Sequence, residues 1–393
     1  MDIKGFKFSA VEAAIKKPGR LDLALIYSDV PATVAAVFTT NKVKAAPLLL
    51  SMERVKSGFS RAVVVNSGNA NACTGKQGMA DALETSRLIA DSLSLPQDTI
   101  LVASTGVIGQ PLPMERMRNA IPNLVGKLSA VTLAEVARAI MTTDTFPKME
   151  IRKGEAGAKK YTVAGVAKGS GMIMPNMATM LSFVVTDAAV DPSWLREFFP
   201  AAVDTSFNCI TVDGDTSTND TALIMANGMA ENPEIRKGTP EAAAFENTVR
   251  DILLSLSRQI VRDGEGATKF VEIVVKGAMS DADSKKAAMA IANSQLVKTA
   301  FFGQDANWGR ILAAIGYSGI DIDQDRVLLS FDDVVVVING VFAGGDAESL
   351  ATEVLKKKEF TVTVDLQLGT GCASVYTTDL SYDYVKINAD YRT

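Results

Sequence analysis

Short runs of apolar, β-branched residues alternate with amphipathic segments along the whole chain, and this alternation constrains the fold most. Such runs are typical of strands, and apolar residues spaced three or four apart are typical of helices, so the pattern predicts an α/β or α+β protein. Several of the runs, such as 61–68 and 221–228, are apolar on both faces. We therefore expect their strands to lie between other layers of structure.

The periodicity gives approximate bounds for the elements. Strands are expected at 21–27, 32–39, 61–68, 99–105, 161–168, 180–188, 221–228, 270–277, 326–340 and 360–369. Helices are expected at 78–94, 132–142, 192–207, 239–263, 283–302 and 346–358. The helix at 239–263 has the clearest start, with Thr239 as its cap and Pro240 in its first turn. A glycine-rich stretch, 153–177, is expected to be weakly structured and to divide the chain into two parts of similar size.

Charge and hydropathy exclude several classes of protein. The formal net charge is −5, with 40 basic and 45 acidic side chains well mixed, which argues against a nucleic-acid partner. No apolar run approaches the ~20 residues needed to cross a bilayer, and the N-terminus does not resemble a secretion signal. We therefore expect a cytoplasmic protein with no membrane partner. Its three cysteines, Cys73, Cys209 and Cys372, are expected to be reduced, buried thiols.

The chain contains no histidine. A Ser-His-Asp or Cys-His relay is therefore excluded, and so is a His-ligated zinc site. The segment 213–220 resembles a calcium loop but has Thr218 where glycine is needed and Ile224 where glutamate is needed. No motif implies a metal or an organic cofactor. If the protein is an enzyme with a base near neutral pH, an α-amino group, with a reference pKa of ~7.7–8.0, can serve.

The stretch "KGSGMIMPNMATMLSFVVTDA", residues 168–188, suggests where such an amine could arise. A flexible loop leads to Ala178, Thr179 and a buried strand. The Thr179 hydroxyl could attack the carbonyl of Ala178 and release a new N-terminus, which would pair a threonine nucleophile with its own amine. Threonines that open strands are usually structural, so this feature alone does not decide the matter.

Three other segments carry suitable chemistry, although each has a simpler structural interpretation. A strand runs directly into Ser104, Thr105 and Gly106, whose backbone and hydroxyl groups could hold an oxyanion. Lys168 could contact a substrate carboxylate or the threonine hydroxyl. Glu265, between two glycines, could approach an ammonium group closely. The segment 63–72 reads as a strand followed by an Asn/Gly turn.

Taken together, these segments resemble the ornithine acetyltransferase (ArgJ) family. The matching pieces are "DLALI", "AAVFTTN", "VVVNSGNANACTG", "ASTGVIG", "MTTDTFPK", "KGSGMIMPNMATML", "DGEGATK", "FFGQDANWGRILAAIGYSG" and "INADYRT", which extend from residue 22 to residue 393. The order and spacing of the whole set are specific, whereas each piece alone is not.

The resemblance implies a mechanism and a set of residues. The chain would cleave itself between Ala178 and Thr179 into fragments 1–178 and 179–393. Thr179 would take an acetyl group from N2-acetylornithine and pass it to glutamate, in the arginine pathway. The oxyanion-hole residues match Thr105 and Gly106. The substrate-binding residues match Thr143, Lys168, Thr179, Glu265, Asn388 and Thr393, with Thr142 and Thr143 hard to separate because they are adjacent.

The resemblance also implies a layered αββα sandwich similar to that of N-terminal-nucleophile hydrolases, and a heterotetramer of two copies of each fragment. Acetyl-CoA is a further potential donor, and neither its use nor feedback inhibition follows from the residues. Two alternatives stay open: a self-processing amidohydrolase or aminopeptidase that releases its acyl group to water, and a binding protein without catalysis.

Overall fold

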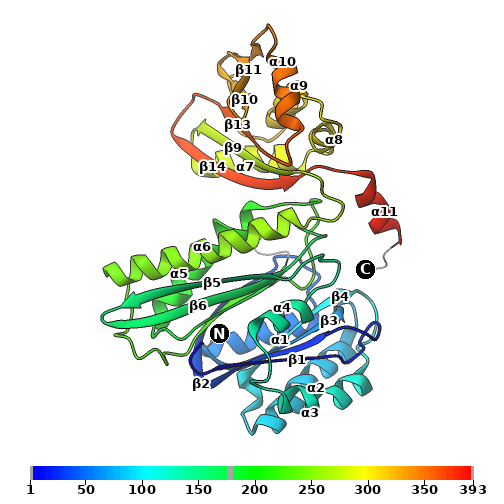
Figure 1. The fold of residues 1–393 in the computed structure, drawn as a ribbon, viewed down its shortest axis with the longest axis vertical. Helices are drawn as coiled ribbons and strands as arrows, with labels where there is room; N and C mark the ends of the chain where they lie inside the picture. The colour runs from blue at the N-terminus through cyan, green and yellow to red at the C-terminus, as the bar shows by residue number, and fades with distance from the viewer. Residues whose placement is uncertain (1–2, 175–179, 391–393) are drawn as a thin grey trace. The chain divides into compact units, whose positions relative to one another are not determined.

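The computed structural model describes residues 3–174 and 180–390. They form two compact units (Figure 1). Unit 1 comprises the described residues up to 208 together with 216–260, and unit 2 comprises 209–215 and the described residues from 261 onwards. The predicted fragments 1–178 and 179–393 do not coincide with these units, because residues 180–208 belong to unit 1. The predicted Ala178–Thr179 junction lies outside the described residues.

Unit 1 is built on one eight-stranded sheet with the order β4-β3-β2-β8-β7-β6-β5, and β1 pairs with β2. The strands are β1 (Phe6–Val11), β2 (Leu23–Phe38), β3 (Phe59–Asn69), β4 (Ile100–Val107), β5 (Lys148–Ala156), β6 (Lys159–Lys168), β7 (Leu181–Thr186) and β8 (Thr221–Ala226). The first half of β2 pairs with β1 and β3, and its second half pairs with β8. A shift of register between Tyr27 and Ala32 separates the two halves.

Because the sheet turns at β2, its two halves face each other as two layers. The apolar residues of one core cluster come from both layers, including Val63 and Leu101 on one side and Val166 and Phe183 on the other. Helix α4 (Leu133–Ala139) contributes Val136 to the same cluster and lies between β1 and β6 in Figure 1. The two-sided apolar strands predicted from the sequence are therefore explained by burial on both faces.

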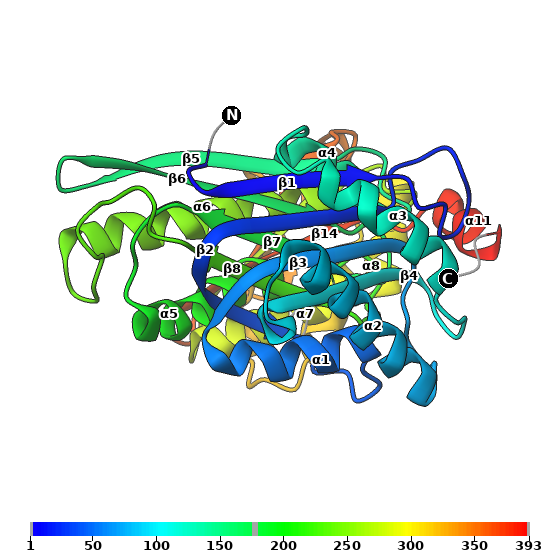
Figure 2. The same ribbon diagram turned by 90° about the horizontal axis from the view of Figure 1, so that it is seen from below.

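Helices cover the two outer faces of unit 1. Helices α1 (Ala46–Arg54), α2 (Gly75–Leu93) and α3 (Met114–Gly126) pack on the β1–β4 half of the sheet, and α2 and α3 lie below β1 in Figure 1. Figure 2 shows the same helices from below. Helices α5 (Pro192–Asp204) and α6 (Pro240–Arg262) cover the other half of the sheet. A Cβ at Gly165 of β6 would lie 3.0 Å from Ile252 and Leu256, so glycine lets α6 approach the sheet closely. The layers follow the order helix, sheet, sheet, helix, which confirms the predicted αββα sandwich.

Unit 2 has two layers. Its six-stranded sheet has the order β12-β11-β10-β13-β9-β14, from β9 (Phe270–Ala278), β10 (Leu328–Phe331), β11 (Val334–Ile338), β12 (Val341–Phe342), β13 (Glu359–Asp365) and β14 (Gly371–Thr378). Its helices are α7 (Asp281–Asn293), α8 (Gln295–Gly303), α9 (Trp308–Gly316), α10 (Ala347–Leu355) and α11 (Tyr382–Asp390). Ile273, Ile291 and Val354 belong to one core cluster, which packs α7–α10 against the sheet.

Several predicted elements differ from those observed. The strands expected at 21–27 and 32–39 are one continuous strand, β2, because the bulge at Tyr27 bends it without ending it. The strand expected at 326–340 is the hairpin β10–β11, which turns at Asp332 with a positive φ of 45°. The helix expected at 283–302 is divided into α7 and α8 by Ser294, whose hydroxyl accepts a hydrogen bond from Val297 N and caps α8.

The stretch expected to be weakly structured contains regular structure. Its first part forms β5 and β6, which pair as an antiparallel hairpin from Lys148↔Ala167 to Ala156↔Lys159. The prediction was wrong for β5, where alternating charged and apolar residues suit a strand with one exposed face although glycine is frequent, whereas the strand expected at 161–168 is confirmed as part of β6. The cysteine prediction was also wrong in part, because Cys73 and Cys372 are exposed and only Cys209 is buried.

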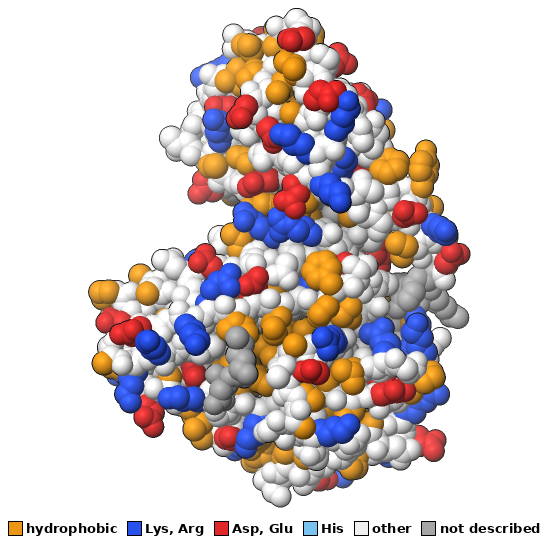
Figure 3. Space-filling model, viewed as in Figure 1, with side chains coloured by type: hydrophobic (Ala, Val, Ile, Leu, Met, Phe, Trp, Pro, Cys, Tyr) orange, Lys and Arg blue, Asp and Glu red, His pale blue; other side chains and the backbone are white. Residues whose placement is uncertain are grey.

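Charges are interspersed on the face of the molecule in Figure 3, where lysine and arginine side chains alternate with aspartate and glutamate. This agrees with the mixed charge pattern of the sequence. Among the described residues, no helix is long and apolar enough to cross a membrane.

Candidate active site

Two parallel strands of unit 1 converge at the first group of predicted site residues. β3 and β4 pair in register from Ala62↔Ile100 to Gly68↔Gly106, and the ladder then shifts at Asn69. Gly106 has a φ of 133°, and a Cβ there would lie 2.3 Å from the carbonyl carbon of Gly68. Only glycine fits such a close approach. The backbone at the end of β4 can therefore adopt this conformation because residue 106 is glycine.

Lys168 reaches this strand end from β6. Its Nζ donates a hydrogen bond of 3.3 Å to Oγ1 of Thr105, although the two residues are 63 positions apart. Lys168 is buried, with 8% exposure. It also pairs with Leu181, the first residue of β7, across the β6–β7 ladder. Lys168 and Thr105, which the sequence analysis selected separately, are therefore in contact. Both lie in the sheet that also contains β7, the strand that begins at Leu181.

A buried carboxylate stabilises the charge of Lys168. Asp144 accepts hydrogen bonds from Lys148 Nζ, from Gly169 N and from Thr142 N, at 2.7, 2.7 and 2.9 Å. Burial alone would raise the pKa of Asp144, but the charges of Lys168 and Lys148 outweigh it and bring the pKa down to about 2. Asp144 is therefore ionised at neutral pH and fixes the loop that contains Thr143.

A second buried carboxyl group near Lys168 behaves in the opposite way. Asp220 precedes β8, and the next residue, Thr221, donates its N–H to the carbonyl of Met180. Burial raises the pKa of Asp220 well above its usual value, even though Ser217, Lys168 and Thr39 all act to lower it. Its Oδ2 has no hydrogen-bond partner among the described residues. Asp220 therefore holds its proton more tightly than an ordinary carboxyl group, beside the segment that ends at Met180.

Asparagines of the segment 63–72 hold the strand ends in place. Asn66 Oδ1 accepts a hydrogen bond of 2.5 Å from Ser104 Oγ, and Asn66 Nδ2 donates to the carbonyl of Asn69. From the loop before β8, Asn219 Nδ2 donates to the carbonyls of Ala70 and Ser104. The structural role predicted for segment 63–72 is therefore confirmed. Its asparagines hold the backbone around residues 104–106, the predicted oxyanion turn.

The second group of predicted residues lies in unit 2. Nδ2 of Asn388, on α11, donates a hydrogen bond of 2.8 Å to Oε2 of Glu265. Asp379 ties the loop of Glu265 to the segment before α11, because its Oδ1 accepts from Thr268 N at 2.8 Å and from Lys269 N at 3.0 Å. These charge-assisted bonds make Asp379 a positioning residue that sequence reasoning missed.

Two further contacts strengthen this tie within unit 2. Ser381 Oγ donates a hydrogen bond of 2.6 Å to the carbonyl of Gly266. A Cβ at Gly266, where φ is 67°, would lie 2.3 Å from Tyr384 N, so the loop requires glycine there. Tyr384 Oη donates to Asp213 Oδ2 at 3.3 Å, and burial together with the charge of Asp213 raises the pKa of Tyr384.

The predicted residues are thus distributed as follows. Thr105, Gly106, Thr143 and Lys168 are in unit 1, and Glu265 and Asn388 are in unit 2. Thr143 is half-buried between Thr142 and Asp144. Ala178, Thr179 and Thr393 lie outside the described residues. Sequence reasoning missed Asp144, Asp220, Asn219 and Asp379, whose roles depend on neighbours far along the chain.

Comparisons with known proteins agree with these features. The model of the ArgJ family matches residues 7–393. A protein of Geobacter sulfurreducens named arginine biosynthesis bifunctional protein ArgJ is 70% identical over the full length of both chains. A protein of the same name from Syntrophotalea carbinolica is 54% identical over 100% of this chain and 99% of its own.

A solved structure supports the same relationship. The crystal structure of arginine biosynthesis bifunctional protein ArgJ from Bacillus halodurans is 43% identical, with a TM-score of 0.51, and covers 53% of this chain and 98% of that chain. The family model, the sequence relatives and the solved structure all point to the same family. This chain belongs to the ArgJ family.

Proposed function

We propose that this chain is an acetyltransferase of arginine biosynthesis, which moves an acetyl group from N2-acetylornithine to glutamate and yields ornithine and N-acetylglutamate. The observation that carries the proposal is the contact between Lys168 and Thr105, made within a chain that matches the ArgJ family from residue 7 to 393. The curated relatives over the full length are named for a bifunctional role in arginine biosynthesis. Acetyl-CoA is proposed as a second acetyl donor.

The nucleophile of the proposed reaction is the hydroxyl of Thr179. It attacks the acetyl carbonyl, and its proton passes to the free α-amine of the same residue and then to the departing amine of ornithine. The α-amine of glutamate attacks the resulting ester, loses a proton to the Thr179 amine and restores the hydroxyl. The negative oxygen formed in each step is held by Thr105 and Gly106.

The described residues support this division of roles. Lys168 donates a hydrogen bond to the Thr105 hydroxyl, and a basic side chain at that strand end favours an oxyanion there. The charges of Lys168 and Lys148 lower the pKa of Asp144, so a carboxylate lies beside these two lysines. Glu265, in contact with Asn388, offers a carboxylate for the ammonium group of an amino acid. Thr143 and Thr393 are proposed as further substrate-binding residues.

Self-cleavage at Ala178–Thr179 is part of the proposal, because the catalytic amine exists only after it. The match to the solved Bacillus halodurans chain covers 98% of that chain but only 53% of this one. The solved chain is therefore about half as long, as expected for one of two separate fragments. We further propose that two copies of each fragment assemble, that no metal or organic cofactor takes part, and that the enzyme acts in the cytoplasm.

The test is an assay of acetyl transfer to glutamate from acetylornithine and from acetyl-CoA, run in parallel with an assay of acetate release. Transfer with ping-pong kinetics and little acetate is the expected result. Release of acetate as the main product would favour the self-processing amidohydrolase. No turnover of either donor by correctly folded protein would contradict the proposal.

A further inference from the structure

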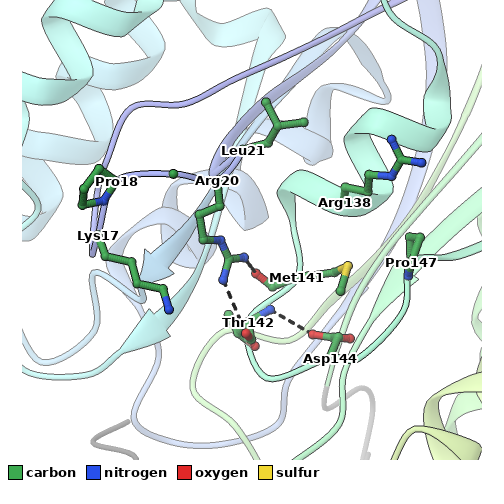
Figure 4. A pocket seen from close by; sticks show the side chains of 10 residues that line it. Lys17, Pro18, Arg20, Leu21, Arg138, Met141, Thr142, Asp144 and Pro147 are labelled. Atoms are coloured by element: carbon green, nitrogen blue, oxygen red, sulfur yellow. Dashed lines mark hydrogen bonds between the residues drawn. The ribbon is translucent and has the colours of Figure 1, made fainter.

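A basic pocket of unit 1 lies beside the loop that contains Thr143. It has a volume of about 680 Å³ and is lined by Lys17 and Arg20 from the loop between β1 and β2, by Arg138 at the end of α4, and by Thr142. In Figure 4, Lys17 and Arg138 stand on opposite sides of the pocket, with Arg20 between them. Its size is typical of a small-molecule site.

The pocket presents an excess of positive charge. Among the described residues that line it, the one acidic residue is Asp144, whose side chain has no exposed surface and pairs with Lys148 at 2.7 Å. Among the described residues, Arg138 forms a long ion pair of 3.9 Å with Glu135, whose carboxylate already caps α4 through Thr132. No carboxylate among the lining residues that the structure describes therefore lies close to the cationic groups of Lys17 and Arg138.

Local bonds give the pocket a defined wall. Arg20 donates hydrogen bonds to the carbonyls of Met141 and Thr142, which joins the 17–21 loop to the 141–144 loop (Figure 4). Gly19 N donates to Glu12 Oε1 at 2.8 Å, which fixes the turn before Arg20. The remaining lining is largely apolar, from Pro18, Leu21, Met141 and Pro147. Such a wall combines surface for a flat ring with charges for anionic groups.

The pocket adjoins the candidate active site through Asp144. This residue lines the pocket and also accepts a hydrogen bond from Gly169 N, directly after Lys168. Lys168 in turn contacts Thr105. A ligand whose charged end occupied the pocket could therefore extend a flexible arm toward the oxyanion turn.

We propose that this pocket binds the phosphate groups of an acyl-coenzyme A donor. A free amino acid has too few anionic groups to use several cations around a pocket of this size, whereas the nucleotide end of coenzyme A carries a 3′-phosphate, a diphosphate and an adenine ring. This inference rests on the proposed function. The thioester carbon would form a bond to the Thr179 oxygen as its bond to sulfur breaks, and the hydroxyl proton would pass through the α-amine to the sulfur.

The test compares the two donors in the Lys17→Ala/Arg138→Ala variant. We leave Arg20 intact because it holds the neighbouring loop. The KM for acetyl-CoA should rise about tenfold or more, as expected for loss of two charge-assisted contacts, while kcat/KM for acetylornithine stays within about twofold. The control is Arg87→Ala/Lys160→Ala, which removes the same charge from exposed positions of unit 1 outside the pocket.

A binding measurement separates the sources of phosphate. Calorimetry with adenosine 3′,5′-bisphosphate, ATP and inorganic phosphate should show the bisphosphate binding best to the wild-type protein, weaker at high salt, and poorly to the pocket variant. Preference for inorganic phosphate, absence of bisphosphate binding, or an equal loss of activity with both donors would overturn the assignment. Failure of the proposed function would instead appear as no transfer from acetylornithine by the wild-type enzyme, whatever the bisphosphate result.

Discussion

At the scale of single residues, the candidate site depends on positions whose chemistry is set by close neighbours. Gly106 has no room for a Cβ beside Gly68, and Asp144 and Asp220 are both buried carboxyl groups with opposite pKa shifts. The difference arises because the charges of Lys168 and Lys148 lower the pKa of Asp144, whereas burial dominates at Asp220, one oxygen of which has no partner among the described residues. Burial raises the pKa of a carboxyl group unless a positive charge compensates for it.

Gly106→Ala is expected to lower kcat/KM for acetylornithine by about 100-fold or more, because the new Cβ would displace one strand end of the oxyanion turn. The measurement is steady-state kinetics together with thermal unfolding. Gly109→Ala is the matched control, since Gly109 also has a positive φ, of 80°, but nothing lies within 4 Å of its Cβ position. Equal activity of the two variants would show that the geometry at Gly106 does not matter for turnover.

Asp220→Asn is expected to become more stable relative to wild type as pH rises above the usual carboxyl pKa. The folded protein keeps Asp220 protonated above the pH at which the unfolded chain releases this proton, so ionisation costs the wild type stability as pH rises above the usual carboxyl pKa. An asparagine has no such cost and matches the shape of the protonated group. Melting temperatures at several pH values measure the difference, with the exposed Asp251→Asn as control. Parallel curves for Asp220→Asn and wild type would refute the raised pKa of Asp220.

At the scale of elements, the sequence predicted most strands and helices but not their junctions. The cap of α6 is confirmed, since Thr239 Oγ1 accepts a hydrogen bond from Ala242 N. The bend in β2 was missed because its bulge depends on pairing with β3 and β8, which lie far along the chain. The candidate residues Thr105 and Lys168 could be selected from motifs, but their contact and the buried Asp144 beneath them require the folded sheet.

Asp144→Asn is expected to lower the free energy of unfolding by about 3–5 kcal/mol, because Lys148 would remain fully buried without this carboxylate. The variant should also lose activity, since the same carboxylate holds Gly169 N beside Lys168. Urea unfolding at neutral pH measures the first effect. Glu53→Gln breaks an exposed pair with Lys56 and should change stability by less than about 1 kcal/mol. A small effect for both variants would contradict the importance of the buried pair.

At the scale of the whole molecule, the proposed cleavage divides the chain within one continuous sheet. β7 pairs with β6, which would belong to fragment 1–178, and with β8, which would belong to fragment 179–393. β8 pairs in turn with β2 of the first fragment. The two fragments therefore share ladders and both core faces of unit 1, and cleavage of one peptide bond removes none of these contacts.

The fragments are accordingly expected to purify together and to separate only when the protein unfolds. Size exclusion in buffer and in denaturing urea, followed by gel electrophoresis, measures this. Separation of the fragments under native conditions would mean that the strand pairing from Lys168↔Leu181 to Val163↔Thr186 does not hold them together.

The most direct measurement is the intact mass of purified, active protein after incubation with acetylornithine and without glutamate. The account predicts two polypeptides, 1–178 and 179–393, with one acetyl group on the second, and a single unmodified chain for Thr179→Ala. Active wild-type protein that remains one chain of 393 residues, or that acquires the acetyl group elsewhere, would contradict it.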